Sequence, residues 1–294
     1  MPRLGALDVA VLESLYQHRL LSTRQVHVLH APEALLREAQ RSLARLRDTE
    51  LAASVRIPGG LGLWYLTPLG LDAVETIPSR AELRRKVITP EQAAGPLQQH
   101  TLGVNDVGIS FVRAARERGH ECGPYAWRHE IAHTLGPPPG RRRPDSLIAD
   151  ALLTYELADP GGGVSVHYRF LELDRATIPT ADLAAKLVRY ARLHRHAIPA
   201  DDPADPPVPL WTRYYPVFPT VLVVLAHEPR DRLERRRQVV LALCHENAEL
   251  GDAPDVAVSV CLLEDLAARG PFAPIFRAAA NPDTPTDWLG DGGS

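Results

Sequence analysis

Three carboxylates near the middle of the sequence have the residue types and the spacing for metal chemistry. Glu172 and Asp174 end an apolar segment that begins at Val164. Because side chains alternate across a strand, both acids share the face that carries Phe170. Asp145 begins the preceding segment, across a glycine-rich turn, so antiparallel pairing is expected to bring it near the other two acids. Three hard oxygen donors in one small volume suit Mg²⁺ or Mn²⁺, which bridge a phosphate and activate water.

This arrangement resembles the PD-(D/E)xK nuclease superfamily, in which Asp145 matches the motif aspartate and Glu172 the second acid. Where that pattern requires lysine, this chain has Asp174. The lysine orients or deprotonates the attacking water and stabilises developing charge, which an aspartate cannot do. Lys186, on the following helix, is the candidate to replace it. A structural alternative stays open, in which the acids are held by arginines: Arg175, Arg189 or the run Arg141–Arg143.

The segments that would position these acids indicate an α/β domain with a mixed sheet. A long amphipathic helix ends at Gly119. The pattern then predicts strands at 125–131, 146–156 and 164–174, a helix at 180–194, a strand at 217–226, a helix at 230–247 and a strand at 256–263. The later strands are the most apolar and are expected to be central and buried. The residues after Arg277 are rich in proline, aspartate and glycine and are expected to be flexible.

The first part of the chain shows a different pattern. Apolar residues from Leu7 to Leu15 recur at helical spacing, and Ser22 is placed to cap a second helix. A third helix is expected to open at Pro32. Two short strands then flank a turn at 58–60, and Thr67 is expected to cap a closing helix. This order predicts a winged helix-turn-helix.

The pattern resembles the winged-helix domains of bacterial regulators that bind DNA, in which the third helix enters the major groove and the hairpin touches the backbone or the minor groove. The resemblance implies DNA contacts from Arg37, Gln40, Arg41 and Arg45 on the third helix and from Arg56 on the hairpin. Phosphate contacts are expected to dominate affinity. The alternative is that these arginines solvate an exposed face and pair with the acids around them, Glu33, Glu38 and Asp48.

Composition limits the class of protein. The chain has 294 residues, of which 45% are hydrophobic and 23% charged, so it is long enough for two globular domains. Its net charge of −3 gives no global attraction to nucleic acid, and binding must come from local patches. Neither an apolar stretch of membrane-spanning length nor a signal sequence is present, so we expect a cytoplasmic protein without membrane partners. The three cysteines lack metal-ligand or disulfide spacing.

Over residues 5–277 the combined motifs resemble the replication-relaxation family, which occurs on actinobacterial plasmids, integrative elements and phages. The similarity rests on the winged helix, the segment His100–Asp106, Arg143–Asp145, Glu172–Arg175 and Lys186–Tyr190. We therefore expect a winged helix at 1–78, a linker at 79–97, a nuclease-like domain at 98–277 and a flexible tail at 278–294. The family name implies a part in plasmid replication or mobilisation.

Three functions remain open at this point. The first, which we favour, is a protein that binds double-stranded DNA and whose nuclease-like domain does not cut. The second is a Mg²⁺-dependent endonuclease or nickase that uses Asp145, Glu172, Asp174 and Lys186. The third is a transcriptional regulator that senses a ligand in the acidic cleft. Winged-helix proteins commonly pair to read two half-sites, so we expect a homodimer.

Overall fold

The computed structural model divides the chain into two compact units. It describes residues 4–56, 62–77, 86–135, 145–158, 161–200 and 205–290. The first unit consists of Met1–Val112 with Cys122–Arg128, and the second of Arg113–Glu121 with His129–Ser294. The long helix that the sequence assigned to the second domain therefore lies mostly in the first unit. The predicted linker at 79–97 and the independent folding of the parts stay predictions.

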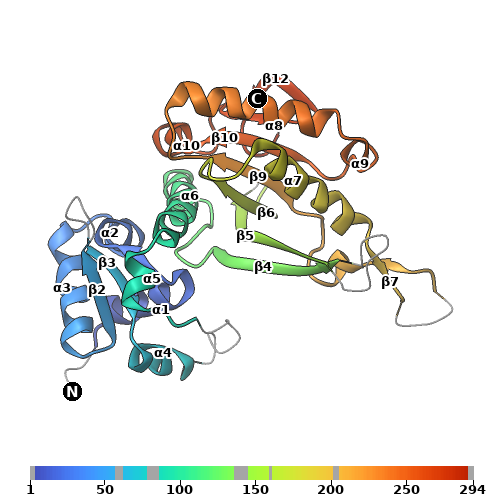
Figure 1. Ribbon diagram of the computed structural model, residues 1–294. Coiled ribbons are helices and arrows are strands. Elements are labelled where there is room, and N and C mark those ends of the chain that lie inside the picture. Colours follow the sequence, from blue (N-terminus) through green and yellow to red (C-terminus); the bar gives the residue numbers. More distant parts are fainter. Residues whose placement is uncertain are drawn as a thin grey trace. The chain divides into compact units, whose positions relative to one another are not determined.

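The first unit contains a small antiparallel sheet and several helices (Figure 1). Its elements are α1 (Ala6–His18), β1 (Leu21–Ser22), α2 (Thr23–His30), α3 (Leu36–Asp48), β2 (Ala52–Arg56), β3 (Gly62–Leu66), α4 (Pro68–Glu75), α5 (Pro90–Ala94) and most of α6 (Leu97–Arg118). The sheet order is β1-β3-β2, and both pairings are antiparallel. The turn between β2 and β3 lies outside the described residues, as do Arg141–Arg143 and Pro144.

Local side-chain bonds explain where these helices begin. The Ser22 hydroxyl accepts from the Gln25 amide at 3.2 Å, and the Gln25 side chain accepts from the Ser22 amide at 3.0 Å, so the pair forms a reciprocal cap. Thr67 caps α4, as predicted: its hydroxyl oxygen accepts a hydrogen bond from the Gly70 amide in the first turn. The third helix starts at Leu36 rather than at Pro32, because residues 31–34 form a turn closed by a backbone hydrogen bond of 3.0 Å.

Side-chain hydrogen bonds attach α6 to the rest of the first unit. Buried Asn105 donates to the Leu20 carbonyl at 2.9 Å and accepts from the Trp127 indole at 3.1 Å. The Gln25 amide donates to Asp106 at 2.8 Å. Buried polar groups need such partners, so these bonds hold α6 against α2, Leu20 and Trp127 of the first unit.

The second unit is built on a seven-stranded mixed sheet with the order β12-β11-β10-β9-β6-β5-β4. In chain order the strands are β4 (Trp127–Leu135), β5 (Asp145–Ala158), β6 (Val164–Asp174), β9 (Thr220–Leu225), β10 (Val258–Leu262), β11 (Phe276–Ala278) and β12 (Asn281–Thr286). β9 lies at the centre, parallel to both β6 and β10. The predictions of a mixed sheet and of buried later strands are confirmed: Val223 and Val260 are fully buried.

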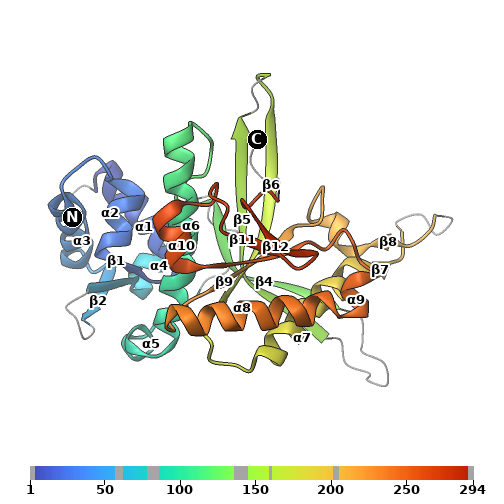
Figure 2. The same ribbon diagram turned by 90° about the horizontal axis from the view of Figure 1, so that it is seen from above.

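Two long helices, α7 (Thr180–Arg195) and α8 (Arg230–His245), lie side by side over one face of this sheet (Figure 2). The core between helices and sheet includes Phe170 from β6, Val223 from β9, Leu187 from α7 and Leu241 from α8. Smaller elements complete the unit: β7 (Ala197–Ile198), β8 (Val208–Pro209), the 3-10 helix η2 (Leu210–Arg213), α9 (Ala248–Gly251) and α10 (Leu263–Arg269). Since Phe170, Glu172 and Asp174 lie at every second position of β6 and share one face, the same two helices cover these acids.

The segment after Arg277, expected to be a flexible tail, instead completes the sheet. β12 pairs with β11, and Trp288 beyond it is 1% exposed. The Trp288 ring lies 4.9 Å from the Tyr155 ring and 4.7 Å from the Arg169 guanidinium. The free energy gained by burying this large aromatic side chain exceeds the cost of ordering a segment rich in proline and glycine, so the prediction of a flexible tail was wrong.

None of the described helices combines the length and the apolar character that crossing a bilayer requires.

Candidate functional site

One face of α3 borders a groove in the first unit. The groove has a volume of about 410 Å³ and is lined by Thr23, Gln40, Ala44, Arg47, Ser54, Arg56, Gly62 and Trp64. Two of the predicted DNA contacts, Gln40 and Arg56, line it. Arg47 lines it as well and was not predicted. Gln40, Ala44 and Arg47 lie at i, i+4 and i+7 and so share one face of the helix. This spacing could have predicted from the sequence that Arg47 lines the groove.

Arg45, another predicted DNA contact, connects α3 to α1. Its guanidinium donates to both carboxylate oxygens of Asp8, at 2.8–3.2 Å, and Asp8 is 1% exposed. Ser42 donates to the same carboxylate at 2.6 Å. Burial by itself raises the pKa of Asp8, but the hydrogen bonds from Arg45 and Ser42 outweigh it and lower the pKa below its ordinary value. Arg45 is thus held in place by a buried acid.

The two remaining predicted contacts, Arg37 and Arg41, are exposed on α3 and share one acid. Arg41 lies 2.8 Å from Glu38, and Arg37 lies 3.8 Å from the same carboxylate. Exposed pairs of this kind contribute at most about 1 kcal/mol. Both guanidinium groups can therefore exchange Glu38 for a phosphate at little cost.

In the second unit, Glu172 lies in a buried hydrogen-bonded group beneath α7. Lys186 donates to one of its carboxylate oxygens, and the Tyr190 hydroxyl donates to the other. Glu172 is 2% exposed. The structure thus brings together the predicted second acid and the predicted replacement lysine. They lie on successive elements, with Lys186 and Tyr190 one helical turn apart on the face of α7 that packs on β6.

Asp150, on β5, completes this group and was not predicted. It accepts from the Lys186 ammonium at 3.4 Å and from the Leu173 amide at 2.8 Å. The register of the β5–β6 hairpin pairs Ala151 with Leu171, which places Asp150 opposite Glu172. The glycine-rich turn centred on Gly161 predicts the same register, so the sequence contained the signal.

Asp145 and Asp174 each have a cationic partner of their own. Asp145 accepts from Arg189 at 2.8 Å, and Asp174 forms a two-fold ion pair with Arg236 of α8. Among the described residues, no group of three His, Cys, Asp or Glu side chains is arranged to hold a metal ion. Asp145, Glu172 and Asp174 therefore do not form the shared cluster that strand alternation and hairpin pairing predicted.

The reason lies in the register of the β5–β6 hairpin. Because Ala151 pairs with Leu171, Asp145 lies five residues, or about 16 Å, along β5 from the position opposite Glu172. There its carboxylate accepts from Arg189 instead.

The electrostatics of the Glu172 group follow from its burial. Burial raises the pKa of Glu172 to about 8, and Asp150 adds to this effect, while Lys186 and Tyr190 oppose it. Burial alone lowers the pKa of Lys186, but Glu172 and Asp150 outweigh it and raise that pKa. Lys186 therefore stays cationic and paired with Asp150, while the raised pKa of Glu172 favours the protonated form of its carboxyl.

A divalent cation fits this group only by rearrangement. Asp150 and Glu172 offer two carboxylates, but all four of their oxygens face Lys186, Tyr190 or the Leu173 amide. A cation bound there would have to displace the Lys186 ammonium. As arranged, the group can hold or transfer a proton.

The sequence model of the replication-relaxation family matches residues 12–203. The match begins within α1 and extends through the first unit and the second unit as far as β7, and it includes the Glu172 group. No curated protein and no solved structure matches the chain.

Proposed function

The chain belongs to the replication-relaxation family, and from this premise we propose that it binds double-stranded DNA in the replication or mobilisation of a plasmid or other mobile element. In this proposal the first unit is a winged helix-turn-helix and the second is a PD-(D/E)xK-like domain that does not cut. Binding as a homodimer to two half-sites is part of the proposal.

The observation that carries the proposal is the groove beside α3. A winged helix places its third helix in the major groove and its hairpin on the backbone, and here Gln40 and Arg47 of α3 face the same groove as Arg56 of β2. Gln40 has the side-chain amide that can pair with adenine, and the two arginines suit phosphate or guanine. Arg37 and Arg41, exposed nearby on α3, add phosphate contacts.

DNA binding is tested by fluorescence anisotropy with random-sequence duplexes and with duplexes selected from a pool. Arg47→Ala and Arg56→Ala are expected to weaken binding to every duplex and to reduce the salt slope by about 1 each. Gln40→Ala is expected to reduce the preference for the selected site by about 1–3 kcal/mol. Arg113→Ala, which removes an exposed arginine of α6 outside the groove, is the matched control. Unchanged affinity and salt slope in all three groove variants would refute this DNA-binding face.

A second candidate function, metal-dependent DNA cleavage, is favoured by one observation: Asp150, Glu172 and Lys186 supply the two acids and the lysine of a PD-(D/E)xK nuclease within one hydrogen-bonded group. A Mg²⁺ or Mn²⁺ ion held by the two acids would supply Lewis-acid activation of water. The ion would first have to displace Lys186, and for this reason we rank cleavage second.

Cleavage is tested by incubating supercoiled plasmid with the protein and Mg²⁺ or Mn²⁺. Nicked or linear product that disappears with Lys186→Met and with Asp150→Asn would establish the second function. Glu249→Gln, which changes an exposed acid paired with Arg192, controls for contaminating nuclease and should cut like the wild-type protein. Absence of product on plasmids that contain the selected binding site would leave DNA binding without cleavage.

A further inference from the structure

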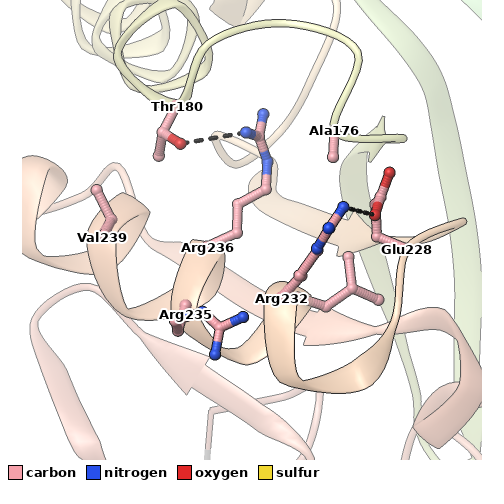
Figure 3. A pocket seen from close by; sticks show the side chains of 8 residues that line it. Ala176, Thr180, Glu228, Arg232, Arg235, Arg236 and Val239 are labelled. Carbon is pink, nitrogen blue, oxygen red and sulfur yellow. Dashed lines mark hydrogen bonds and ion pairs between the residues drawn. The ribbon is translucent and has the colours of Figure 1, made fainter.

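A second pocket, in the second unit, is lined in part by three arginines of α8. Its volume is about 370 Å³. The lining residues are Ala176, Thr180, Glu228, Arg232, Leu233, Arg235, Arg236 and Val239 (Figure 3). They come from the turn after β6, the first residue of α7, the loop after β9 and α8. The pocket thus lies beyond the carboxyl ends of the parallel strands β6 and β9. It plays no part in the groove of the first unit or in the Glu172 group.

Arg236 forms the inner wall of this pocket and is fixed in place. Its side chain is 11% exposed. Its guanidinium donates twice to Asp174, once to the Ile178 carbonyl at 2.8 Å and once to the Thr180 hydroxyl at 3.1 Å. A guanidinium has five N–H donors, so these bonds account for four of them. The Thr180 hydroxyl accepts from Arg236 and keeps its own hydrogen to donate.

Arg232 and Arg235 form the outer wall and are held weakly. Arg232 lies 3.2 Å from Glu228 and Arg235 lies 2.6 Å from Asp231, each one turn earlier in the chain. Both arginine side chains are about two-thirds exposed, at 67% and 66%. Exposed pairs of this type contribute at most about 1 kcal/mol. The two guanidinium groups can therefore leave their carboxylates for a stronger acceptor.

A phosphate group is the acceptor that this combination fits. Arginine binds phosphate through paired N–H donors, and such charge-assisted bonds are roughly twice as strong as neutral ones. Two movable guanidinium groups, a fixed one and a free hydroxyl hydrogen line one concave site. Each of the three arginines already has a carboxylate partner, Glu228, Asp231 or Asp174, so the net positive charge is small and a single phosphate fits better than a polyanion. We propose that this arginine pocket binds one phosphate group, either a phosphodiester of the DNA backbone or a free phosphate.

The free-phosphate form is tested by thermal unfolding of the full chain in sodium phosphate and in sodium chloride of equal ionic strength. The dependence of Tm on phosphate concentration gives the affinity. The Arg232→Ala, Arg235→Ala double variant is expected to weaken phosphate binding at least about tenfold. Val239→Asp, which adds a carboxylate to the pocket and leaves its ion pairs in place, is expected to do the same. Arg195→Ala, an exposed arginine of α7 outside the pocket, should bind phosphate like the wild-type chain.

The DNA form, which rests on the proposed function, is tested by duplex affinity as a function of salt. Loss of one backbone phosphate contact in the double variant should reduce the salt slope by about 0.9. A reduced slope assigns the pocket to the DNA backbone, and phosphate-dependent Tm with an unchanged slope assigns it to free phosphate. If neither measurement distinguishes the pocket variants from Arg195→Ala, the proposal is wrong. If no duplex binds at all, the proposed function fails, and the phosphate titration alone decides this inference.

Discussion

Replacing Glu172 by glutamine should change how the stability of the protein depends on pH. Burial raises the pKa of Glu172 from 4.5 to about 8. A carboxyl whose pKa is raised on folding stabilises the folded state fully below its unfolded value, and this contribution is lost as the pH rises through the folded value. Each pH unit between the two values costs about 1.4 kcal/mol. Across the whole interval the wild-type chain should lose about 5 kcal/mol from this one group.

Glutamine cannot ionise, so Glu172→Gln removes this loss and keeps a carbonyl oxygen for the Tyr190 hydroxyl. Glutamine resembles the neutral carboxyl that the wild-type chain holds below its folded pKa, so the remaining cost of the substitution is a change in the hydrogen bonds to Lys186 and is nearly constant with pH. The free energy of unfolding of the variant minus that of the wild type should therefore rise by several kcal/mol between about pH 5 and about pH 8. Urea unfolding at intervals of pH, with linear extrapolation, measures this difference.

Glu249→Gln is the matched control. Glu249 is on the surface, and hydrogen bonds from Arg192 lower its pKa, so it stays ionised across the same range and its difference should be flat. A flat difference for Glu172→Gln as well would mean that Glu172 is ionised throughout. In that case the ion pair with Lys186 dominates over burial, and the electrostatic account of this group is incorrect.

Three further predictions concern stability, each measured by urea unfolding. Trp288→Ala should destabilise the chain by about 3–5 kcal/mol, because it empties a buried aromatic site in the C-terminal part of the sheet; a change below about 1 kcal/mol would indicate a flexible tail. Arg45→Ala should cost about 2 kcal/mol by leaving the buried Asp8 carboxylate without its cation, and Arg45→Lys should recover part of it. Gly70→Ala should cost at least about 3 kcal/mol, since the added Cβ would lie 2.0 Å from a backbone oxygen, whereas Gly161→Ala, with open space around it, should not share this steric cost.

The order of elements in both units could be predicted from the sequence because it depends on local signals. Ser22 and Thr67 begin helices through bonds to residues three positions later, and the apolar segment of β9 identifies itself as a buried strand. Lys186 was placed beside Glu172 correctly because a helix after a strand packs back on it.

The site could be predicted only in part because its geometry depends on the hairpin register and on distant partners. The register places Asp150, and not Asp145, opposite Glu172; the turn centred on Gly161 implies this register, but Asp145 was selected for its match to the nuclease motif. The ion pair between Arg45 and the buried Asp8 could not be predicted because Asp8 lies in another helix, far away in the sequence. The segment near Trp288 was predicted to be flexible because its composition reflects only local conformational preference. The composition does not show that Trp288 packs against the distant Tyr155 ring.

The parallel pairing of β6 with β9 has a consequence for synthesis of the chain. Asp174 ends β6 and Thr220 begins β9, so roughly 45 residues separate them, which at translation rates of about 5–20 residues per second takes several seconds. During that time the β6 edge of the newly made β5–β6 hairpin is apolar and unpaired, because β9 has not yet been synthesised. Nascent chains on one messenger RNA can therefore aggregate through this strand edge, and slower translation after Asp174 should increase the aggregation.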